Sequence, residues 1–313
     1  MSRREFLKLG GASALGALVG GAAFSLSPTF DSGSTENSSR KLNRTSNRNR
    51  PPNPAQWTLA FEDLFDSGSL DRSTWSVGWG WGRRTSTSPT RIVPRNVGVD
   101  SNRLRLEGTH SDGDVLSGAV NTKDNVTFGP GTYLEARLKF AQRTGFQNAF
   151  WSKPNSEAWP PEIDVAELIQ DESEWNDIHV SRHNLHYSSS TKPGDNSTYE
   201  NINTTHVPGN NLTENFHTYG VEWQPNSISH FVDGQKIWEW TDQTMLLAMR
   251  RGAPFYILLS LNINSVGTAS LNVPWGEQFV TDWVRLWRHT PSGSNGSAST
   301  TQLSNRLENE HSN

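Results

Sequence analysis

Cysteine is missing from all 313 residues of the sequence. Without it the chain has no disulfides, so the burial of apolar side chains must hold the fold together. The sequence also lacks a large excess of either charge, because its formal net charge is only −4. This balance gives no indication of a polyanion as partner, and we expect no nucleic acid binding. The length allows one large all-β domain or two small ones.

Long apolar runs are also rare, and the main one stands close to the N-terminus. Residues 2–8, with the sequence SRREFLK, form a twin-arginine export signature, and a stretch rich in Gly, Ala and Leu follows over 9–23. The stretch is short and rich in glycine, so it predicts a removable signal rather than a membrane span. An ordinary amphipathic start is the alternative, which the paired arginines disfavour. We expect a twin-arginine signal peptide over 1–24, a secreted, extracellular protein, and no membrane association after the signal is removed.

Two segments of low apolar content flank the central part of the chain. Residues 25–55 are rich in Ser, Asn, Arg and Pro, and residues 291–313 have a similar composition. Such segments bury too little apolar surface to offset the entropy of folding, so we expect a disordered linker and a disordered tail. The folded domain is expected over 56–290.

Short strand-like runs, separated by turn residues, fill this central part. They lie at 59–62, 102–107, 133–140, 217–223, 228–232, 235–240, 255–261 and 283–287. One short helix is expected over Thr244–Arg250. Many short strands with long loops predict an all-β fold, a jelly-roll sandwich of two antiparallel sheets. Glu135 and Arg137 share one face of a strand, which suits a wet groove on a concave sheet or simple solvent exposure.

Three carboxylates stand in one short run, Pro161–Ile169, with the sequence PEIDVAELI. Like charges placed side by side raise one another's pKa, so Glu162, Asp164 and Glu167 are costly to pack together. A chain tolerates this cost mainly where the acids act chemically. A solvated acidic edge strand is the alternative, but the preceding double proline and the aromatic neighbours favour a cleft.

Strand geometry relates the three acids to one another. Their β-branched neighbours indicate a strand, on which Glu162 and Asp164 point the same way and Glu167 is out of phase by one residue. A β-bulge, which adds one residue to a strand, would return Glu167 to the face of the other two. The two glutamates could then approach to the ~5–5.5 Å between carboxyl groups that a retaining glycosidase uses. Asp164 could hydrogen-bond one of them and tune its proton affinity.

Further segments surround the carboxylate run in a fixed order. They are FEDLF at 61–65, GAVNTK at 118–123, YLEARLK at 133–139, NAFW at 148–151, HTYGVEW at 217–223 and DWVRL at 282–286. Together with the run, they resemble glycoside hydrolase family 16, the laminarinase- and lichenase-like β-glucanases. The resemblance covers Trp57 to Arg288, and its carboxylate signature is highly specific. It implies a concanavalin-like jelly roll with a concave substrate groove.

The same resemblance implies a retaining endo-glycosidase. Carried over residue by residue, it makes Glu162 the nucleophile, Glu167 the general acid/base and Asp164 the assisting carboxylate. A protonated Glu167 would donate to the leaving oxygen while Glu162 attacks the anomeric carbon. Glu167 would then act as base on water, so the sugar keeps its configuration. No cofactor is required for this chemistry, and we expect a monomer.

Five further residues are candidate substrate contacts. Trp151 and Trp159 flank the acids and are candidate sugar platforms, although core packing is the commoner fate of a tryptophan. His186 matches a His-Tyr pair that the family places beside the active site. Arg137 and Asn148 are weaker candidates for contacts with sugar hydroxyls.

A structural calcium on the convex side occurs in many members of this family. Glu62 and Asp282 stand where that site would be, and oxygen ligands suit calcium. Each of the two residues could equally be an ordinary surface acid.

With its extra residue between Asp164 and Glu167, the carboxylate run resembles the run of laminarinases, agarases and carrageenases more than the run of lichenases. The double proline before Glu162 favours β-1,3-glucan or mixed β-1,3/1,4-glucan as the polysaccharide substrate. A rival hypothesis is a galactan hydrolase for agar or carrageenan, whose sulfated substrate would favour a basic groove. The arginines that could supply this groove are Arg83, Arg84, Arg91 and Arg95. A transglycosylase on the same fold and a carbohydrate-binding module without catalysis remain open as well.

Overall fold

A computed structural model describes residues 51–84, 89–111, 113–170, 177–192, 194–263 and 275–290 of the chain. The predicted signal peptide, residues 25–50 of the predicted linker and the predicted tail lie outside these ranges. Within the described ranges, no helix is both long enough and apolar enough to cross a membrane.

Eight strands form the first sheet, and all their pairings are antiparallel. Their order is β17 (Gln235–Trp240), β16 (Ser227–Val232), β15 (His217–Gln224), β10 (Thr132–Lys139), β19 (Gln278–His289), β5 (Arg103–Glu107) and β4 (Val97–Asp100), with β1 (Trp57–Asp63) pairing β19. Asp233 and Gly234 join β16 to β17, and both have positive φ. The dipeptide Asp-Gly favours this conformation, which a tight hairpin turn requires.

Another eight antiparallel strands form the second sheet. Their order is β14 (Tyr199–His206), β13 (Ser181–Ser188), β12 (Glu162–Ile169), β11 (Phe146–Pro154), β18 (Phe255–Ile263), β8 (Ala119–Asn121) and β2 (Ser76–Val77), with β9 (Thr127–Phe128) pairing β18. The carboxylate run therefore lies on β12, a central strand of this sheet.

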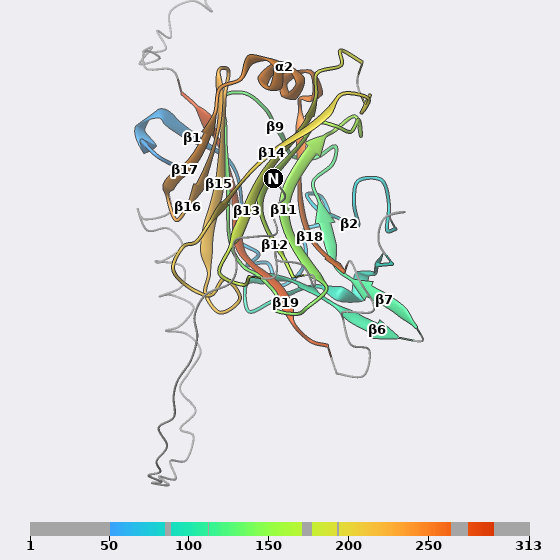
Figure 1. The fold of residues 1–313 in the computed structure, drawn as a ribbon. Coiled ribbons are helices and arrows are strands. Elements are labelled where there is room, and N and C mark those ends of the chain that lie inside the picture. Colours follow the sequence, from blue (N-terminus) through green and yellow to red (C-terminus); the bar gives the residue numbers. More distant parts are fainter. Residues whose placement is uncertain are drawn as a thin grey trace, which may run out of the picture. The chain divides into compact units, whose positions relative to one another are not determined.

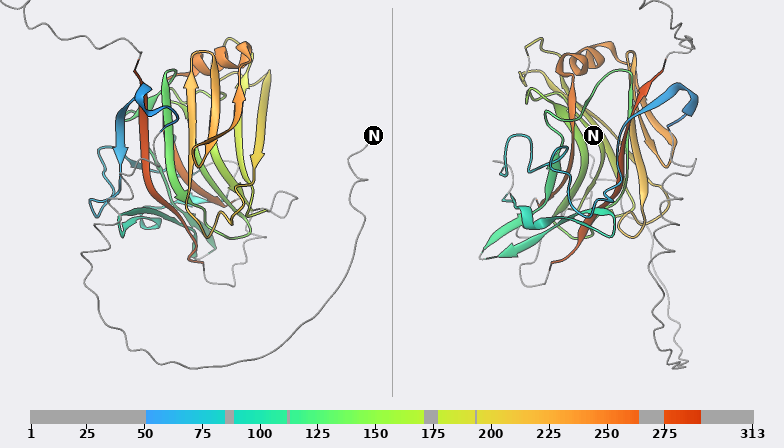
Figure 2. Two further views of the ribbon diagram at one scale, coloured as in Figure 1. Left: turned by 90° about the vertical axis from the view of Figure 1, so that its left-hand side faces the viewer. Right: turned by 180° about the vertical axis from the view of Figure 1, so that it is seen from behind.

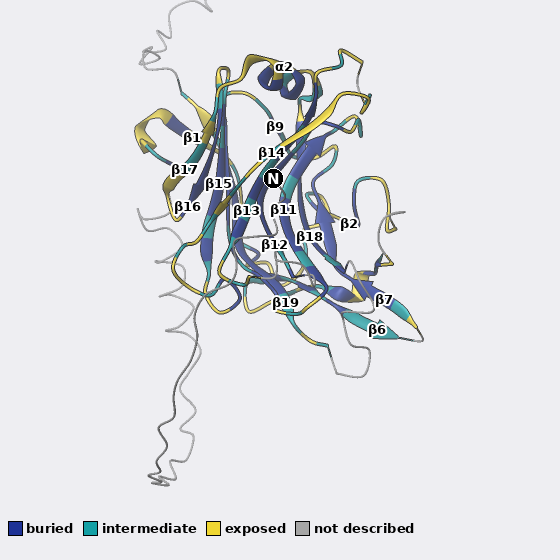
Figure 3. Ribbon diagram, viewed as in Figure 1, coloured by how far each residue is buried: buried dark blue, intermediate teal, exposed yellow. Residues whose placement is uncertain are grey.

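The two sheets pack face to face, and the second sheet is curved (Figures 1 and 2). Side chains that point inward from both sheets form one large buried cluster, which includes Phe150, Ile163, Val221 and Trp223. Figure 3 shows the resulting pattern, in which the middle strands are buried along most of their length. This sandwich is the predicted jelly roll, with an apolar core between its two sheets.

Smaller elements cover the sandwich. A third sheet contains β3 (Arg91–Ile92), β7 (Asp114–Ser117) and β6 (Thr109–Ser111). Short 3₁₀ turns lie at Pro54–Gln56 (η1) and Pro94–Asn96 (η2). The helix α2 (Gln243–Gly252) covers one end of the sandwich in Figure 1. It begins at Asp242, whose side chain accepts a hydrogen bond from the Met245 N–H and so caps the helix.

The expectation of a wet groove at Glu135 and Arg137 is wrong. Glu135 and Arg137 lie on β10 in the first sheet, away from the strand that carries the acids. Glu135 is buried and accepts a hydrogen bond from the Trp287 indole N–H at 3.0 Å, so its face of the strand is not a wet groove. Burial raises the pKa of Glu135 to about 7.

Candidate active site

A β-bulge in β12 brings the three carboxylates into phase. On the β11 side, Phe150 is opposite Ala166 and Trp151 is opposite Asp164, so Val165 has no partner. On the β13 side, the pairing also shifts between Asp164 and Glu167. The predicted bulge is therefore present, and it inserts one residue between the second and third acids.

The three acids line one pocket of about 180 Å³, which we call the carboxylate pocket. Its lining residues are Trp79, Trp81, Gln147, Ala149, Trp151, Glu162, Asp164, Glu167, Ser260 and Asn262. They come from β11, β12, β18 and the segment that follows β2. The apolar residues between the acids point the other way, into the core between the sheets.

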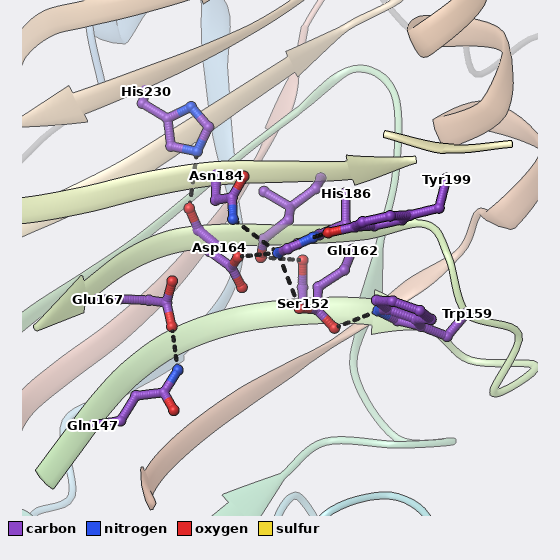
Figure 4. Close-up of polar contacts among 11 residues, drawn as sticks. Gln147, Ser152, Trp159, Glu162, Asp164, Glu167, Asn184, His186, Tyr199 and His230 are labelled. Atoms are coloured by element: carbon purple, nitrogen blue, oxygen red, sulfur yellow. Dashed lines mark hydrogen bonds and ion pairs between the residues drawn. The ribbon is translucent and has the colours of Figure 1, made fainter. Parts of the chain in front are cut away.

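Glu162 and Asp164 meet at the ring of His186 (Figure 4). The Nε2 atom of His186 lies 3.0 Å from Asp164 Oδ2 and 3.6 Å from Glu162 Oε1. The Trp159 indole N–H donates a hydrogen bond to Glu162 Oε2 at 3.1 Å. Two residues on separate elements therefore contact the Glu162 carboxylate, which fixes its orientation.

His186 is itself held by neighbours on the second sheet. Its Nδ1 atom shares a hydrogen bond with the Tyr199 hydroxyl at 2.6 Å, and the Asn184 side-chain nitrogen lies 2.9 Å from Nε2. The plane of the Tyr199 ring is inclined by 15° to the ring of His186 and by 29° to the ring of Trp159, with centroids 5.8 and 5.3 Å apart. These three rings form a cluster that borders the acids (Figure 4).

Glu167 has a different environment on the other side of the bulge. It accepts a hydrogen bond from the Gln147 amide at 2.7 Å, and its carboxyl is buried. Burial raises the pKa of Glu167, an effect that the Gln147 hydrogen bond partly opposes. A carboxyl with a raised pKa can hold a proton near neutral pH, as a general acid must.

The other two acids have raised pKa values as well. Burial raises the pKa of Glu162 well above its usual range, and the charge of Asp164 adds to the effect. For Asp164, burial is again the largest cause of its raised pKa and the charge of Glu167 is the second. Two buried carboxylates and the largely buried Glu162 cannot all ionise cheaply at this proximity, so the three acids share protons among themselves.

Aromatic rings surround the carboxylate pocket. Trp79 and Trp81 are stacked in parallel, with centroids 5.8 Å apart, and Trp151 meets Trp81 edge to face at 6.0 Å. Trp81 and Trp159 are 43% and 37% exposed, which is unusual for so large an apolar side chain. Exposed indole faces beside buried acids are suited to stack on sugar rings.

The structure separates two predicted substrate contacts from this pocket. Asn148 is fully buried, and its amide bonds the Ala141 backbone N–H and carbonyl on the core side of β11. Arg137 forms an ion pair with Asp282 at 2.8 Å on the first sheet. By contrast, Trp151, Trp159 and His186 all lie beside the acids.

The residues predicted to bind calcium are paired with arginines. Glu62 accepts from Arg285 at 2.6 Å, and Asp282 bridges Arg103 and Arg137 at 3.2 and 2.8 Å. Three guanidinium groups at these acids disfavour a bound cation. The residues therefore do not fit a calcium site. Among the described residues, the one close group of three potential metal ligands is Glu162, Asp164 and His186, whose ligand atoms lie within 4.8 Å of one another.

Sequence reasoning missed several residues of the pocket, and Gln147 is the most informative. Gln147, Ala149 and Trp151 alternate along β11 and all line the pocket. Once Trp151 was assigned to the cleft, the two-residue period of a strand would have selected Gln147 and excluded Asn148. No such pattern marks Tyr199, which comes from a segment with no strand prediction.

Comparisons with known proteins agree on one family. A model described as β-porphyranase A–D, glycoside hydrolase family 16 domain, matches residues 57–289. A β-glucanase from Rhodothermus marinus is 24% identical over 257 residues, which are 74% of this chain and 85% of that protein. An endo-1,3-1,4-β-glycanase, ExsH, from Rhizobium meliloti strain 1021 is 26% identical over 181 residues. These are 56% of this chain and 34% of that protein, so the match spans about a third of that relative.

A solved structure shares the fold. The endo-β-1,3-glucanase from Pyrococcus furiosus aligns with a TM-score of 0.63 and 22% identity, over 77% of this chain and 97% of that chain. The family model, the relatives and the sandwich with its bulged carboxylate strand all agree. The chain belongs to glycoside hydrolase family 16 and is a hydrolase of O-glycosyl bonds.

Proposed function

We propose that this protein is a secreted endo-hydrolase that cleaves a β-linked polysaccharide with retention of configuration. The observation that carries the proposal is the bulge in β12, which turns Glu162, Asp164 and Glu167 into one pocket walled by indole rings. Endo-cleavage is supported by the description of the Rhizobium meliloti relative as an endo-1,3-1,4-β-glycanase. The pair of glutamates suits a double displacement.

Glu162 is the proposed nucleophile and Glu167 the proposed acid/base. The Trp159 N–H at Glu162 favours the ionised carboxylate that attacks the anomeric carbon. Buried Glu167 keeps a proton for the leaving oxygen and then takes one from the incoming water. Asp164 lies beside Glu162, so a proton on Asp164 would relieve the charge repulsion when Glu162 ionises.

A β-1,3- or mixed β-1,3/1,4-glucan is the first candidate substrate. The names of the relatives support it, because the matched proteins from Rhodothermus marinus and Rhizobium meliloti are described as a β-glucanase and an endo-1,3-1,4-β-glycanase. Apolar platforms such as Trp151 and Trp159 suit the uncharged pyranose rings of such a chain.

A galactan is the second candidate, because the matching family model is described as a β-porphyranase. Exposed cations beside Trp81 support it, because Arg83 and Arg84 follow this ring closely in the chain and are exposed. Lys153 Nζ also lies 4.4 Å from the centre of the ring, but it is buried and pairs with Glu157 at 3.0 Å. Arg91 is less suited to a basic groove, since it pairs with Asp114 at 2.7 Å. A sulfate ester on the substrate would complement the exposed arginines.

Export through the twin-arginine pathway completes the proposal. It rests on the SRREFLK sequence at residues 2–8 and on the apolar stretch behind it. Expression with the native N-terminus should place the mature protein outside the cytoplasm, and Arg3→Lys/Arg4→Lys should retain it inside. Equal export of both forms would contradict the pathway.

The substrate is tested with a panel of laminarin, mixed-linkage β-glucan, agarose, κ-carrageenan and porphyran, with reducing sugar as the readout. The stereochemistry is tested by NMR of the first product, which should be the β-anomer. Azide added to Glu162→Ala with an activated substrate should give an α-glycosyl azide, whereas Glu167→Ala should give the β-azide. The reverse pattern would exchange the two roles, and an α-anomer from the parent would contradict retention.

A further inference from the structure

Two histidines lie buried between the sheets, beneath the bulge of β12. His183 belongs to β13 in the second sheet and His230 to β16 in the first, and neither ring is exposed. The Nδ1 atom of His183 lies 2.6 Å from the Val165 carbonyl oxygen. The Nε2 atom of His230 lies 3.1 Å from the Asp164 carbonyl oxygen, a contact drawn in Figure 4.

The register of β12 relates these two carbonyls to the bulge, because Asp164 is the last paired residue before the register shift on both sides. Val165 has no opposite residue on β11 or on β13. The extra residue of a bulge stands outside the ladder of backbone hydrogen bonds, and a buried carbonyl without a donor costs free energy. His183 therefore supplies a donor to the unpaired residue of the bulge, and His230 supplies one to the residue directly before it.

The hydrogen-bond partners fix the tautomer of each ring. A carbonyl oxygen only accepts, so Nδ1 of His183 and Nε2 of His230 carry the protons. The Nε2 atom of His183 lies 3.0 Å from the Ser181 hydroxyl oxygen and accepts a hydrogen bond from this hydroxyl. The rings meet edge to face at 5.5 Å, and Trp238 stacks on His230 at 5.4 Å, so both donors are held in place.

Both rings are neutral donors rather than cations. Burial lowers the pKa of His183 to about 4 and the pKa of His230 well below its usual range. A cation beneath β12 would favour ionised carboxylates above it, which a general acid cannot tolerate. Neutral N–H groups donate to the two backbone carbonyls without adding a positive charge, which would lower the pKa of the acids.

We propose that His183 and His230 are positioning residues for hydrolysis, which hold the two carbonyls of the bulge and so set the direction of the Asp164 and Glu167 side chains. The contact from His230 also ties the carboxylate strand to the opposite sheet. The proposal rests on the roles proposed above for the carboxylates. It concerns side chains that touch neither substrate nor the carboxyl groups.

Matched variants separate the donor from the bulk of each ring. Asn places an amide nitrogen where His183 has Nδ1, and Gln places one where His230 has Nε2. His183→Asn and His230→Gln therefore keep the donor, whereas His183→Leu and His230→Leu remove it. Thr122→Val is the control, because Thr122 is fully buried and donates to the Val126 carbonyl outside the carboxylate pocket.

Hydrolysis by the full-length protein is measured across pH, together with its melting temperature. We expect the Leu variants to lose about tenfold or more in kcat with little change in KM, which is about 1.4 kcal/mol of transition-state stabilisation. Their pH profiles should shift, because displaced carboxyls titrate differently. The Asn and Gln variants should recover most of the kcat. Thr122→Val should lower the melting temperature and keep both kcat and the profile.

The outcomes also distinguish this proposal from the proposed function. An inactive parent, or an active Glu162→Gln variant, would contradict the carboxylate roles themselves. An active parent whose Leu variants keep kcat within about twofold would overturn only the positioning role. The same holds if the donor-keeping variants are as impaired as the Leu variants, or if Thr122→Val loses kcat equally.

Discussion

Glu162 illustrates at the scale of one residue how a buried acid that is proposed to act in catalysis opposes folding. Its pKa is raised by burial first and by Asp164 second, so ionisation is less favourable in the folded chain than in the unfolded one. We expect Glu162→Gln to stabilise the protein at pH 7, by about 1.4 kcal/mol for each unit by which the pKa is raised. Urea denaturation at pH 7 and pH 4 measures the effect.

The sign of this effect gives its pH dependence. A raised pKa in the folded state removes stability as the pH rises, so the advantage of Glu162→Gln should fade towards pH 4, where the acid is protonated in both states. Glu214→Gln, a change of an exposed glutamate, is the control and should give no gain. Equal gains at both pH values would show that charge is not the cause.

Gln147 allows a second test on a single residue. Its amide donates to the Glu167 carboxylate and lowers the pKa of this acid. We expect Gln147→Leu to raise the pKa of Glu167, so the basic limb of the kcat/KM profile should move to higher pH. Gln142→Leu, outside the carboxylate pocket, should leave this limb in place. A limb that stays or moves to lower pH in Gln147→Leu would contradict the assignment of Glu167.

At the scale of the element, the one extra residue of β12 determines which face of the strand Glu167 occupies. Without Val165, the run would read Glu-Ile-Asp-Ala-Glu, and regular alternation alone would place all three acids on one face. We therefore expect the deletion of Val165 to keep measurable hydrolysis at a lower melting temperature, since a buried valine is lost. Deletion of both Val165 and Ala166 should abolish hydrolysis, because Glu167 would turn into the core. Reducing-sugar release and thermal unfolding measure both effects.

Equal activity in the two deletion variants would contradict the hypothesis that strand alternation decides which face Glu167 occupies. A single deletion that folds but shows no activity would mean that the bulge also sets the spacing of the carboxyls along the strand. In either case, circular dichroism identifies variants that fail to fold.

The strands also show how much of the fold the sequence determines locally. Alternation located β5 and β10, turn residues located β15 and β17, and the predicted helix over Thr244–Arg250 lies within α2. Alternation does not say which sheet a strand joins, since pairing depends on contacts far away in the chain. This is why Arg137 was placed in the cleft although β10 belongs to the first sheet.

The candidate site was predictable where its chemistry is encoded in consecutive residues. Glu162, Asp164 and Glu167 and their bulge follow from one run. Tyr199 does not, because β14 is a polar edge strand whose burial pattern gives no apolar stripe. The same reasoning missed His230, which reaches the bulge from the opposite sheet, 66 positions along the chain from Asp164.

At the scale of the whole molecule, ion pairs link β19 to its neighbours β1, β5 and β10 in the first sheet, at the residues where the family resemblance implies a calcium. The guanidinium groups of Arg103 and Arg137 flank Asp282, and Arg285 holds Glu62. We expect neither EDTA nor added calcium to change the melting temperature. Arg137→Met should lower it, because the largely buried Asp282 then loses a partner. A rise in melting temperature with calcium would show that the arginines release these acids.

The buried histidines should dominate the acid sensitivity of the whole domain. The pKa of His183 falls to about 4 in the folded chain, against 6.5 when unfolded, so only the unfolded chain gains a proton between these values. Stability that is present above pH 6.5 is therefore lost towards pH 4, at up to about 1.4 kcal/mol per pH unit for one histidine. In His183→Asn this loss should be smaller.

Denaturation of the parent and of His183→Asn at half-unit steps from pH 7 to pH 4 measures the difference between the two proteins. The difference cancels contributions from the carboxylates, whose raised pKa values act in the opposite direction and are common to both. The two curves should converge as the pH falls, because the parent alone loses the contribution of a neutral His183. Parallel curves would mean that His183 takes up a proton inside the folded domain, and the neutral donor beneath the bulge would then be excluded.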